Sequence, residues 1–335
     1  MKKVANIVLL AVLAAGLLSC TKTDRFYGNP QEEIAMNPVM HSMSKAEVPG
    51  PVTGSQYPDA EHFGVIAYYS PSFTHSQEWT NTSSVLMYLD GHEFEKEGST
   101  FSGIPKCYWP HQGSLVFAGY SPFDAIKESI TFNPATKALT ITGFVSNGQT
   151  DLMYFLPDLS NGNLVGRNSR ASSVPAVFSH ALSLVSFDMQ VRDGDEDDIK
   201  LKKIILKDMY ATGNFTVLAS DPATAAWTRT SDARDTTVFN SDAGQGLSPS
   251  VQVDVLVIPG EAVDIQIVYE TKFYDMDESA VVIKELTAEI DPSEVGVTTW
   301  ETGKKYLYDV VKEANKIEVI PSTDYIGVIE KESQK

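Results

Sequence analysis

Cys20 is the residue whose type and position most clearly point to a chemical modification. It follows Leu17-Leu18-Ser19, at the end of an apolar run from Val4 to Leu18 that comes after the positively charged Met1-Lys2-Lys3. This order is typical of a secretory signal peptide whose cleavage site is followed directly by cysteine, as in a bacterial lipobox. The run of about 15 residues is shorter than the roughly 20 that a transmembrane helix needs. The sequence therefore predicts a signal peptide over residues 1–19.

In a lipobox, the cysteine sulfur takes a diacylglycerol and the new N-terminus is acylated, for example with palmitate. Each buried CH₂ group of an acyl chain contributes about 0.8 kcal/mol, so two or three chains hold a protein firmly in a membrane. We therefore expect Cys20 to carry lipid and the mature chain to work outside the cytoplasm. An ordinary signal peptide that happens to have a cysteine nearby is the alternative.

No other set of residues has the spacing of a catalytic or cofactor-binding motif. The six histidines share no metal-ligand spacing, and the chain has neither a G-x-S-x-G nucleophile elbow nor a Gly-rich phosphate loop. His180 lies in Phe178-Ser179-His180-Ala181-Leu182, at the start of an apolar strand, where a hydrogen-bonded structural histidine is expected rather than a catalytic base. Two carboxylates could hydrolyse a glycoside, but 44 acidic residues make any one pair uninformative. The sequence predicts no enzyme, no metal site and no cofactor.

The acidic run Asp193-Gly194-Asp195-Glu196-Asp197-Asp198 has enough carboxylates to attract calcium. An EF-hand loop beginning at Asp193 would need glycine at its sixth position and glutamate at its twelfth, where this chain has Asp198 and Ile204. The run is therefore expected to be a solvated hairpin turn, with weak calcium binding as the alternative.

Cys107 is the one cysteine left once Cys20 carries lipid, so the exported chain can form no intramolecular disulfide. Its setting, Cys107-Tyr108-Trp109-Pro110, favours a small buried apolar residue over a catalytic thiol. Exposed aromatic rings could instead bind glycans, and Trp79, Trp227 and Trp300 are the candidates. Trp300 precedes the final predicted strand and is expected in the core, whereas Trp227 lies in a polar stretch where its ring could be exposed.

Composition limits the class of protein. Removal of residues 1–19 lowers the lysine and arginine count from 26 to 24 against 44 acidic residues, so the mature chain has a net charge near −20. A charge of this sign repels nucleic acid, whose binding needs basic patches. The mature chain also exceeds the length that one core usually serves, so two domains are expected.

Short β-strands separated by turn signals dominate the chain from Phe63 onward. Strands are expected over residues 63–69, 85–89, 115–120, 137–144, 151–156, 185–191, 199–206, 251–257, 263–269, 280–290 and 306–311, with one short helix over 124–128. The second of these strands is expected to stop at the turn pair Asp90-Gly91. Such a pattern indicates antiparallel β-sandwiches.

The strands fall into two groups. Residues 20–60 form a Pro- and Gly-dotted lead with no convincing helix or long strand and are expected to be a lipidated tether. Residues 61–173, which end in a polar linker-like stretch from 158, are the predicted N-terminal sandwich domain, and residues 174–314 the C-terminal one. Residues 315–335 form a strand-like tail that must bury its apolar side chains somewhere.

Several segments resemble motifs of a known family. They are Tyr108-Trp109-Pro110, the strand from Leu115 to Pro122, the segment from Phe178 to Phe187, Ile258-Pro259-Gly260 and the closing stretch from Trp300 to Tyr306. In their order and spacing, over roughly residues 60–320, they resemble the fimbrillin family, the lipoprotein subunits of type V pili of Bacteroidales. The resemblance implies an all-β fold of two tandem transthyretin-like antiparallel β-sandwich domains.

The resemblance also implies an assembly mechanism. Subunits reach the cell surface as lipoproteins, and a trypsin-like protease removes an N-terminal segment that includes a strand of the first domain. A C-terminal strand of the next subunit then fills the groove by β-augmentation. In this chain the candidate cleavage residues are Arg25 and Lys45.

The candidate donor strand is the tail from Asn315 to Ile329. Its plausible anchors are Ile317, Val319 and Tyr325, and Pro321 interrupts it, which a strand tolerates at a bulge or an edge. If neither candidate cleavage residue is cut, the subunit would stay bound to the membrane, as an anchor subunit would.

The sequence thus favours a structural pilus subunit at the cell outer membrane and in the fimbrium, supporting adhesion. Its partners would be other pilus subunits, the outer membrane through the lipid on Cys20 and a host glycan or protein, but no nucleic acid. A tip or membrane-anchor fimbrillin with an adhesive role and a surface glycan-binding lipoprotein are the alternatives.

Overall fold

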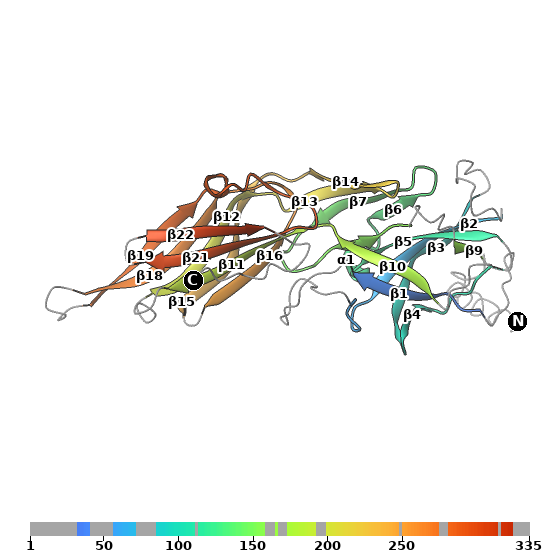
Figure 1. Cartoon of the computed structure of the whole chain (residues 1–335), viewed down its shortest axis with the longest axis horizontal. Coiled ribbons are helices and arrows are strands. Elements are labelled where there is room, and N and C mark those ends of the chain that lie inside the picture. Colours follow the sequence, from blue (N-terminus) through green and yellow to red (C-terminus); the bar gives the residue numbers. More distant parts are fainter. Residues whose placement is uncertain are drawn as a thin grey trace, which may run out of the picture.

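The computed structural model describes residues 32–40, 56–71, 85–110, 113–157, 165–166, 173–191, 199–247, 250–274, 281–313 and 316–323. The all-β class is confirmed over these residues, which form an elongated stack of sheets (Figure 1). The short helix expected at 124–128 is α1 (Phe123–Ile126), and a 3-10 helix η4 spans Pro292–Val295. No helix in this described part of the chain is long and apolar enough to cross a membrane.

The first sheet is built mainly from the N-terminal half and closes on itself. Its order is β2-β3-β4-β1-β10-β8-β5-β9, and β2 also pairs with β5, which completes the ring. Its strands are β1 (Ala35–Met40), β2 (Phe63–Ser70), β3 (Leu86–Glu97), β4 (Thr100–Ile104), β5 (Ser114–Ser121), β8 (Met153–Phe155), β9 (Val165–Gly166) and β10 (Val174–His180).

Strands β2 and β5 are covered on both faces, so most of their residues are buried. One face looks into an aromatic core inside the closed sheet, where the Phe63 ring lies 5.4 Å from the ring of Tyr57 and 5.3 Å from that of Phe178. The other face carries Ile66 and Val116 into a second cluster shared with the next sheet. Burial on two sides explains why β5 reads as a continuous apolar run rather than an alternating one.

The second sheet takes strands from both sides of the predicted boundary at residue 173. Its order is β14-β13-β7-β6, and β7 pairs with β13 through partners such as Ile141 and Phe215. The strands are β6 (Ile130–Asn133), β7 (Ala138–Val145), β13 (Thr212–Leu218) and β14 (Asp221–Arg229). Because β10, after residue 173, also pairs with β1 and β8, the two parts of the chain share sheets, and the division at 173 stays a prediction.

The remaining strands form two four-stranded sheets around one apolar core. One has the order β16-β11-β21-β22 and the other β15-β12-β18-β19, and β17 pairs separately with β20. The bounds are β11 (Ser183–Val191), β12 (Ile199–Met209), β15 (Arg234–Gly246), β16 (Val251–Val257), β17 (Gly260–Glu261), β18 (Ile265–Tyr274), β19 (Val281–Ile290), β20 (Thr299–Trp300), β21 (Lys305–Glu313) and β22 (Lys316–Thr323).

The turn expected at Asp90-Gly91 is wrong, because β3 runs through this pair to Glu97. Gly91 has a φ of 57°, a left-handed conformation that glycine adopts at little cost, and the register of β3 against β2 shifts at this point. Such a local change is a β-bulge, which bends and twists a strand without ending it. The Asp-Gly signal therefore marked a real backbone irregularity of another kind.

The lead contains one short strand, which the sequence pattern alone does not place. Residues 35–40 form β1, which lies inside the first sheet rather than in a tether (Figure 1). Proline and glycine around it hid a short strand that tertiary pairing stabilises. An element before residue 60 therefore belongs to the first sheet.

Candidate functional site

Strand β1 joins the N-terminal segment of the chain to the first sheet. It lies between β4 and β10, antiparallel to β4 at Ala35 and Met36 and parallel to β10 from Met36 to Met40. Its partners on β10 run from Val174 to Phe178. Without β1, strands β4 and β10 would lose their shared neighbour and the ring would open.

Every second residue from Ile34 to Met40 faces the core. Ile34 and Met36 are 0% exposed, Met40 is 5% exposed and Pro38 is buried, whereas Asn37 between them is exposed. Burial of a large apolar side chain contributes about 1.5–3 kcal/mol. The segment thus supplies part of the core, and its loss would leave an apolar groove.

Pro38 marks a position of β1 that needs no backbone N–H. Proline has no N–H to donate, so a sheet accepts it only where no donor is required. The pairing of β1 with β4 ends at Met36, and the next contact on that side is a single bridge from Val39 to Gln56. Pro38 therefore lies in the gap between two pairings.

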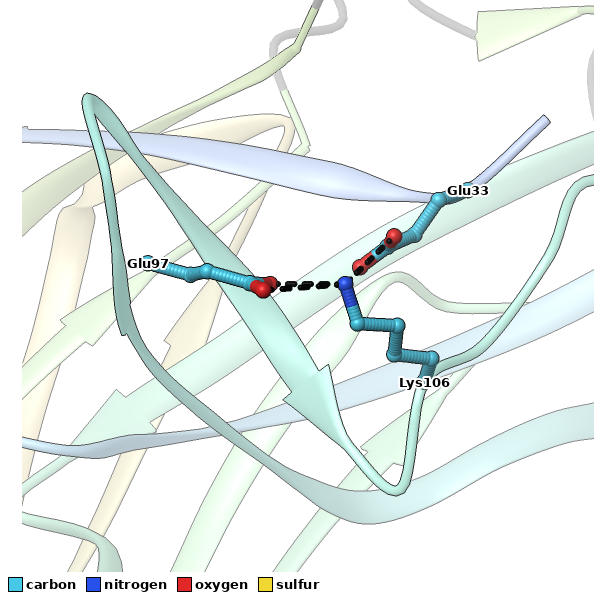
Figure 2. A network of polar contacts seen from close by, with 3 residues as sticks. All are labelled: Glu33, Glu97 and Lys106. Atoms are coloured by element: carbon cyan, nitrogen blue, oxygen red, sulfur yellow. Dashed lines mark hydrogen bonds and ion pairs between the residues drawn. The ribbon is translucent and has the colours of Figure 1, made fainter. Parts of the chain in front are cut away.

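An ion network holds the start of β1 (Figure 2). The Lys106 Nζ donates to Glu33 Oε2 at 3.1 Å and to Glu97 Oε2 at 2.8 Å, so Glu33, just before β1, is joined to the β3–β4 hairpin. The hydrogen bonds to Glu97 and Glu33 raise the pKa of Lys106 to about 12. Ion pairs this exposed add little stability, so the network contributes little to holding β1 in the sheet.

The tail ends in an edge strand. In the described part of the chain, β22 pairs with β21 alone, antiparallel, from Glu313 opposite Lys316 to Tyr306 opposite Thr323. The predicted anchors Ile317 and Val319 lie in β22, whereas Tyr325 lies outside the described residues. Pro321 lies in this strand opposite Tyr308, as an edge position allows. An edge strand has one unused row of backbone groups and can pair with another chain.

Cys20, Arg25 and Lys45 lie outside the described residues, but their order along the chain still carries information. Arg25 precedes β1, and Lys45 is the only lysine or arginine between Met40 and Phe63, the start of β2. A trypsin-like cut at Arg25 would leave β1 attached to the first sheet. A cut at Lys45 would separate it from the rest of the chain.

The described residues contain no group of three or more side chains suited to hold a metal ion. The expectation for His180 is confirmed, since the side chain is buried and its Nδ1 lies 2.9 Å from Asp151 Oδ1. His62 lies on the surface with its Nδ1 2.8 Å from Glu93 Oε1. The His180 contact joins the end of β10 to the segment before β8, and the His62 contact joins the residue before β2 to β3.

The two described tryptophan candidates are both packed. Trp300 is 0% exposed, as expected, and its Nε1 donates to Tyr308 Oη at 3.1 Å. Trp227 lies in β14, where its ring centre is 5.3 Å from that of Phe215 and its Nε1 donates to the Ala181 carbonyl at 2.6 Å. Trp227 is therefore partly buried and packed against the core rather than exposed.

The third candidate, Trp79, lies outside the described residues, as does the acidic run Asp193–Asp198. Cys107 is half-buried and packs against the core of the closed sheet, in line with an apolar role. The remaining candidate site therefore consists of two strands, β1 inside the first sheet and β22 at the edge of the sheet β16-β11-β21-β22.

The comparison with protein families fits this arrangement. A family model described as fimbrillin-like matches residues 52–323. The chain belongs to the fimbrillin-like family. The resemblance of the motifs from Tyr108 to Tyr306 is thereby confirmed, and the match begins after β1 and ends with the last residue of β22.

Solved structures share the fold of this fimbrillin-like chain. A fimbrial protein from Bacteroides vulgatus is 12% identical to this chain with a TM-score of 0.57, and the match covers 87% of this chain and 98% of the fimbrial protein's chain. Two proteins described provisionally as cell adhesion proteins, from Bacteroides uniformis and Bacteroides ovatus, are each 13% identical to this chain with a TM-score of 0.52. The match covers 88% of this chain for the first and 89% for the second, and 99% of the related chain in both cases. At this identity the likeness shows the fold alone. No curated protein matches the chain.

Proposed function

We propose that this chain is a structural subunit of a surface pilus, exported as a lipoprotein and polymerised by donor-strand exchange. The family and the fold of the related fimbrial protein support a role in a fimbrium at the outer membrane, structural rather than enzymatic. The observation that carries the mechanism is β1, a short apolar strand inside the first sheet whose connection to β2 contains one site for a trypsin-like protease.

On this proposal, cleavage at Lys45 rather than Arg25 prepares the subunit for assembly. Only the cut at Lys45 allows β1 to leave, taking Cys20 and its lipid with it. Ile34, Met36 and Met40 would then vacate a groove between β4 and β10 lined by the core of the closed sheet. Exposed apolar surface of this kind favours a strand that can refill it.

The donor would be β22, with Ile317, Val319 and Tyr325 as anchors. As an edge strand, β22 can leave β21 without breaking a sheet in two. Donation from one subunit to the next joins two different surfaces, and a contact of this type grows a filament unless its rotation closes a ring. We also propose that the two units of this filament subunit are the transthyretin-like sandwiches of the resemblance.

The test is limited trypsin treatment of the chain that starts at Thr21, with N-terminal sequencing and an unboiled SDS gel. We expect a new N-terminus at Ala46 and a ladder of SDS-resistant multimers. Lys45→Gln should abolish both, whereas the matched control Arg25→Gln should leave both intact. Intact mass should confirm that the tail has not been cut.

Deletion of Asn315–Lys335 completes the design. The shortened chain should still be cut at Lys45 but stay monomeric, because it has a groove and no donor. A clean cut at Lys45 that leaves only monomer in the full chain would instead indicate a tip subunit. No cut at either residue would indicate a lipid-retained anchor, and either result would refute the stalk role.

A further inference from the structure

The tail repeats the side-chain pattern with which β1 fills the first sheet. From Ile34 to Met40 the buried positions read Ile34, Met36, Pro38 and Met40. From Ile317 to Thr323, the same spacing reads Ile317, Val319, Pro321 and Thr323. Both segments begin with isoleucine, continue with an apolar residue and place proline at the fifth position.

The prolines decide the register. A donor strand with a proline can enter a sheet only if that proline meets a position where the sheet needs no N–H. Within the groove, the position of Pro38 meets this condition, because the native strand itself has proline there between its pairings to β4 and Gln56. Pro321 is the only proline of the tail. A shift of two residues would place Pro321 where Met36 or Met40 now lies.

From this match we infer that the groove vacated by β1 accepts the tail of a second copy of this chain, with Ile317, Val319 and Pro321 at the positions of Ile34, Met36 and Pro38. The inference rests on the proposed strand exchange and adds its partner and its register. The tail segment is β-competent over this length, since Lys316–Thr323 already forms strand β22 with Pro321 inside it. The chain is thereby self-complementary and suited to a homopolymer.

The inferred register predicts which residue of the tail lies opposite Val177 of β10. Val39 of β1 lies opposite Val177 of β10, an exposed residue. In the inferred register, Ser322 takes the place of Val39 and therefore lies opposite Val177 of the acceptor. Cysteines at these two positions would have Cα atoms at the spacing of neighbouring strands, which a disulfide can bridge. A shift of two residues along the strand adds about 6.6 Å and puts the pair beyond reach.

The experiment mixes two variants of the chain from Thr21, both carrying Cys107→Ser. One carries Val177→Cys and the other Ser322→Cys, so a disulfide between the two positions can form only between copies. After limited trypsin and mild oxidation, we expect a dimer on a nonreducing gel that disappears on reduction and is absent without trypsin. Matched controls place the tail cysteine two residues away, as Ile320→Cys or Asp324→Cys, and should give no dimer above the uncut background.

The possible outcomes test the register separately from the proposed strand exchange. Multimers that cross-link through Ile320→Cys or Asp324→Cys, but not Ser322→Cys, would overturn the register while strand exchange stands. Multimers that cross-link with none of the three would overturn the tail of a second copy as the occupant. A cut chain that forms no multimers at all would overturn both the inference and the proposed function.

Discussion

Met36→Ala should destabilise the uncut chain but not the assembled one. Met36 is 0% exposed in the core of the closed sheet, so truncation removes buried methylene groups and leaves a cavity. Such changes cost about 2–5 kcal/mol, so a loss of about 3 kcal/mol is expected. For a unit of this size, each kcal/mol lowers the melting temperature by about 2–4 °C. We therefore expect the melting temperature of the uncut variant to fall by about 6–12 °C.

The assay is thermal melting of the chain from Thr21, followed by circular dichroism. Asn37→Ala is the matched control, because it alters the neighbouring residue of the same strand at an exposed position. Surface changes of this kind usually stay within about 0.5 kcal/mol, so the control should melt like the parent chain. An equally stable Met36→Ala chain would show that β1 is not part of the stable core.

The same variant then reports on assembly. Once Lys45 is cut and a tail fills the groove, residue 36 has left the molecule and its identity no longer matters. Multimers made from the Met36→Ala chain should therefore melt at the same temperature as multimers of the parent chain. A lower melting temperature in the multimers as well would mean that β1 remains in place, and it would refute strand replacement.

Three further predictions concern the cores. Gly64→Ala should cost about 1–3 kcal/mol, visible in thermal melting, because a Cβ there would lie 2.1 Å from the Tyr120 ring. Tyr308→Phe should lower the unfolding free energy in urea by about 1–3 kcal/mol, because the buried Trp300 N–H loses its acceptor. Burial raises the pKa of Tyr308 to about 12, because the core disfavours the deprotonated phenol. The stability that comes from burying the neutral phenol is therefore full below about pH 10, where the unfolded side chain titrates, and is lost as pH rises to about 12. Urea titrations across that window should show a shallower loss of stability for Tyr308→Phe than for the parent chain.

The strands that could be predicted from the sequence are those whose burial leaves a pattern in the side chains. Strand β11 places Val185, Phe187 and Met189 in one core, and these apolar residues alternate with others along the sequence. Strand β5 is covered on both faces and reads as an unbroken apolar run. In both cases the packing of side chains selects the residues, and the residues therefore predict the strand.

Strands β14 and β15 could not be predicted, because the burial of their side chains leaves no clear pattern. Most of their residues are exposed or only half-buried, and they are held by backbone pairing to β13 and β12. Backbone hydrogen bonds leave no trace in side-chain periodicity, so the segment reads as a polar loop. The same polar pattern suggested that the Trp227 ring could be exposed, whereas the ring is partly buried and packs from strand β14.

The candidate site could be predicted only in part. The tail was expected to be strand-like, and Ile317 and Val319 do lie in β22. The lipid on Cys20 and the cut at Arg25 or Lys45 stay predictions, since they concern chemistry outside the described residues. The resemblance implies that a cut releases a strand of the first domain. The residues alone did not place that strand, because a six-residue strand with an internal proline gives too short a pattern to identify.

On the proposed mechanism, this difficulty has a physical origin. A strand that must first complete a core and later leave it cannot be long, because every added pair and every buried side chain would hold it more strongly. A strand that replaces it must accept the same backbone constraint, and so it carries a proline in the same place. Each strand alone therefore looks irregular, and the informative signal is the likeness between Ile34–Met40 and Ile317–Thr323. That likeness gains meaning only when the burial of β1 shows which of its residues line the groove.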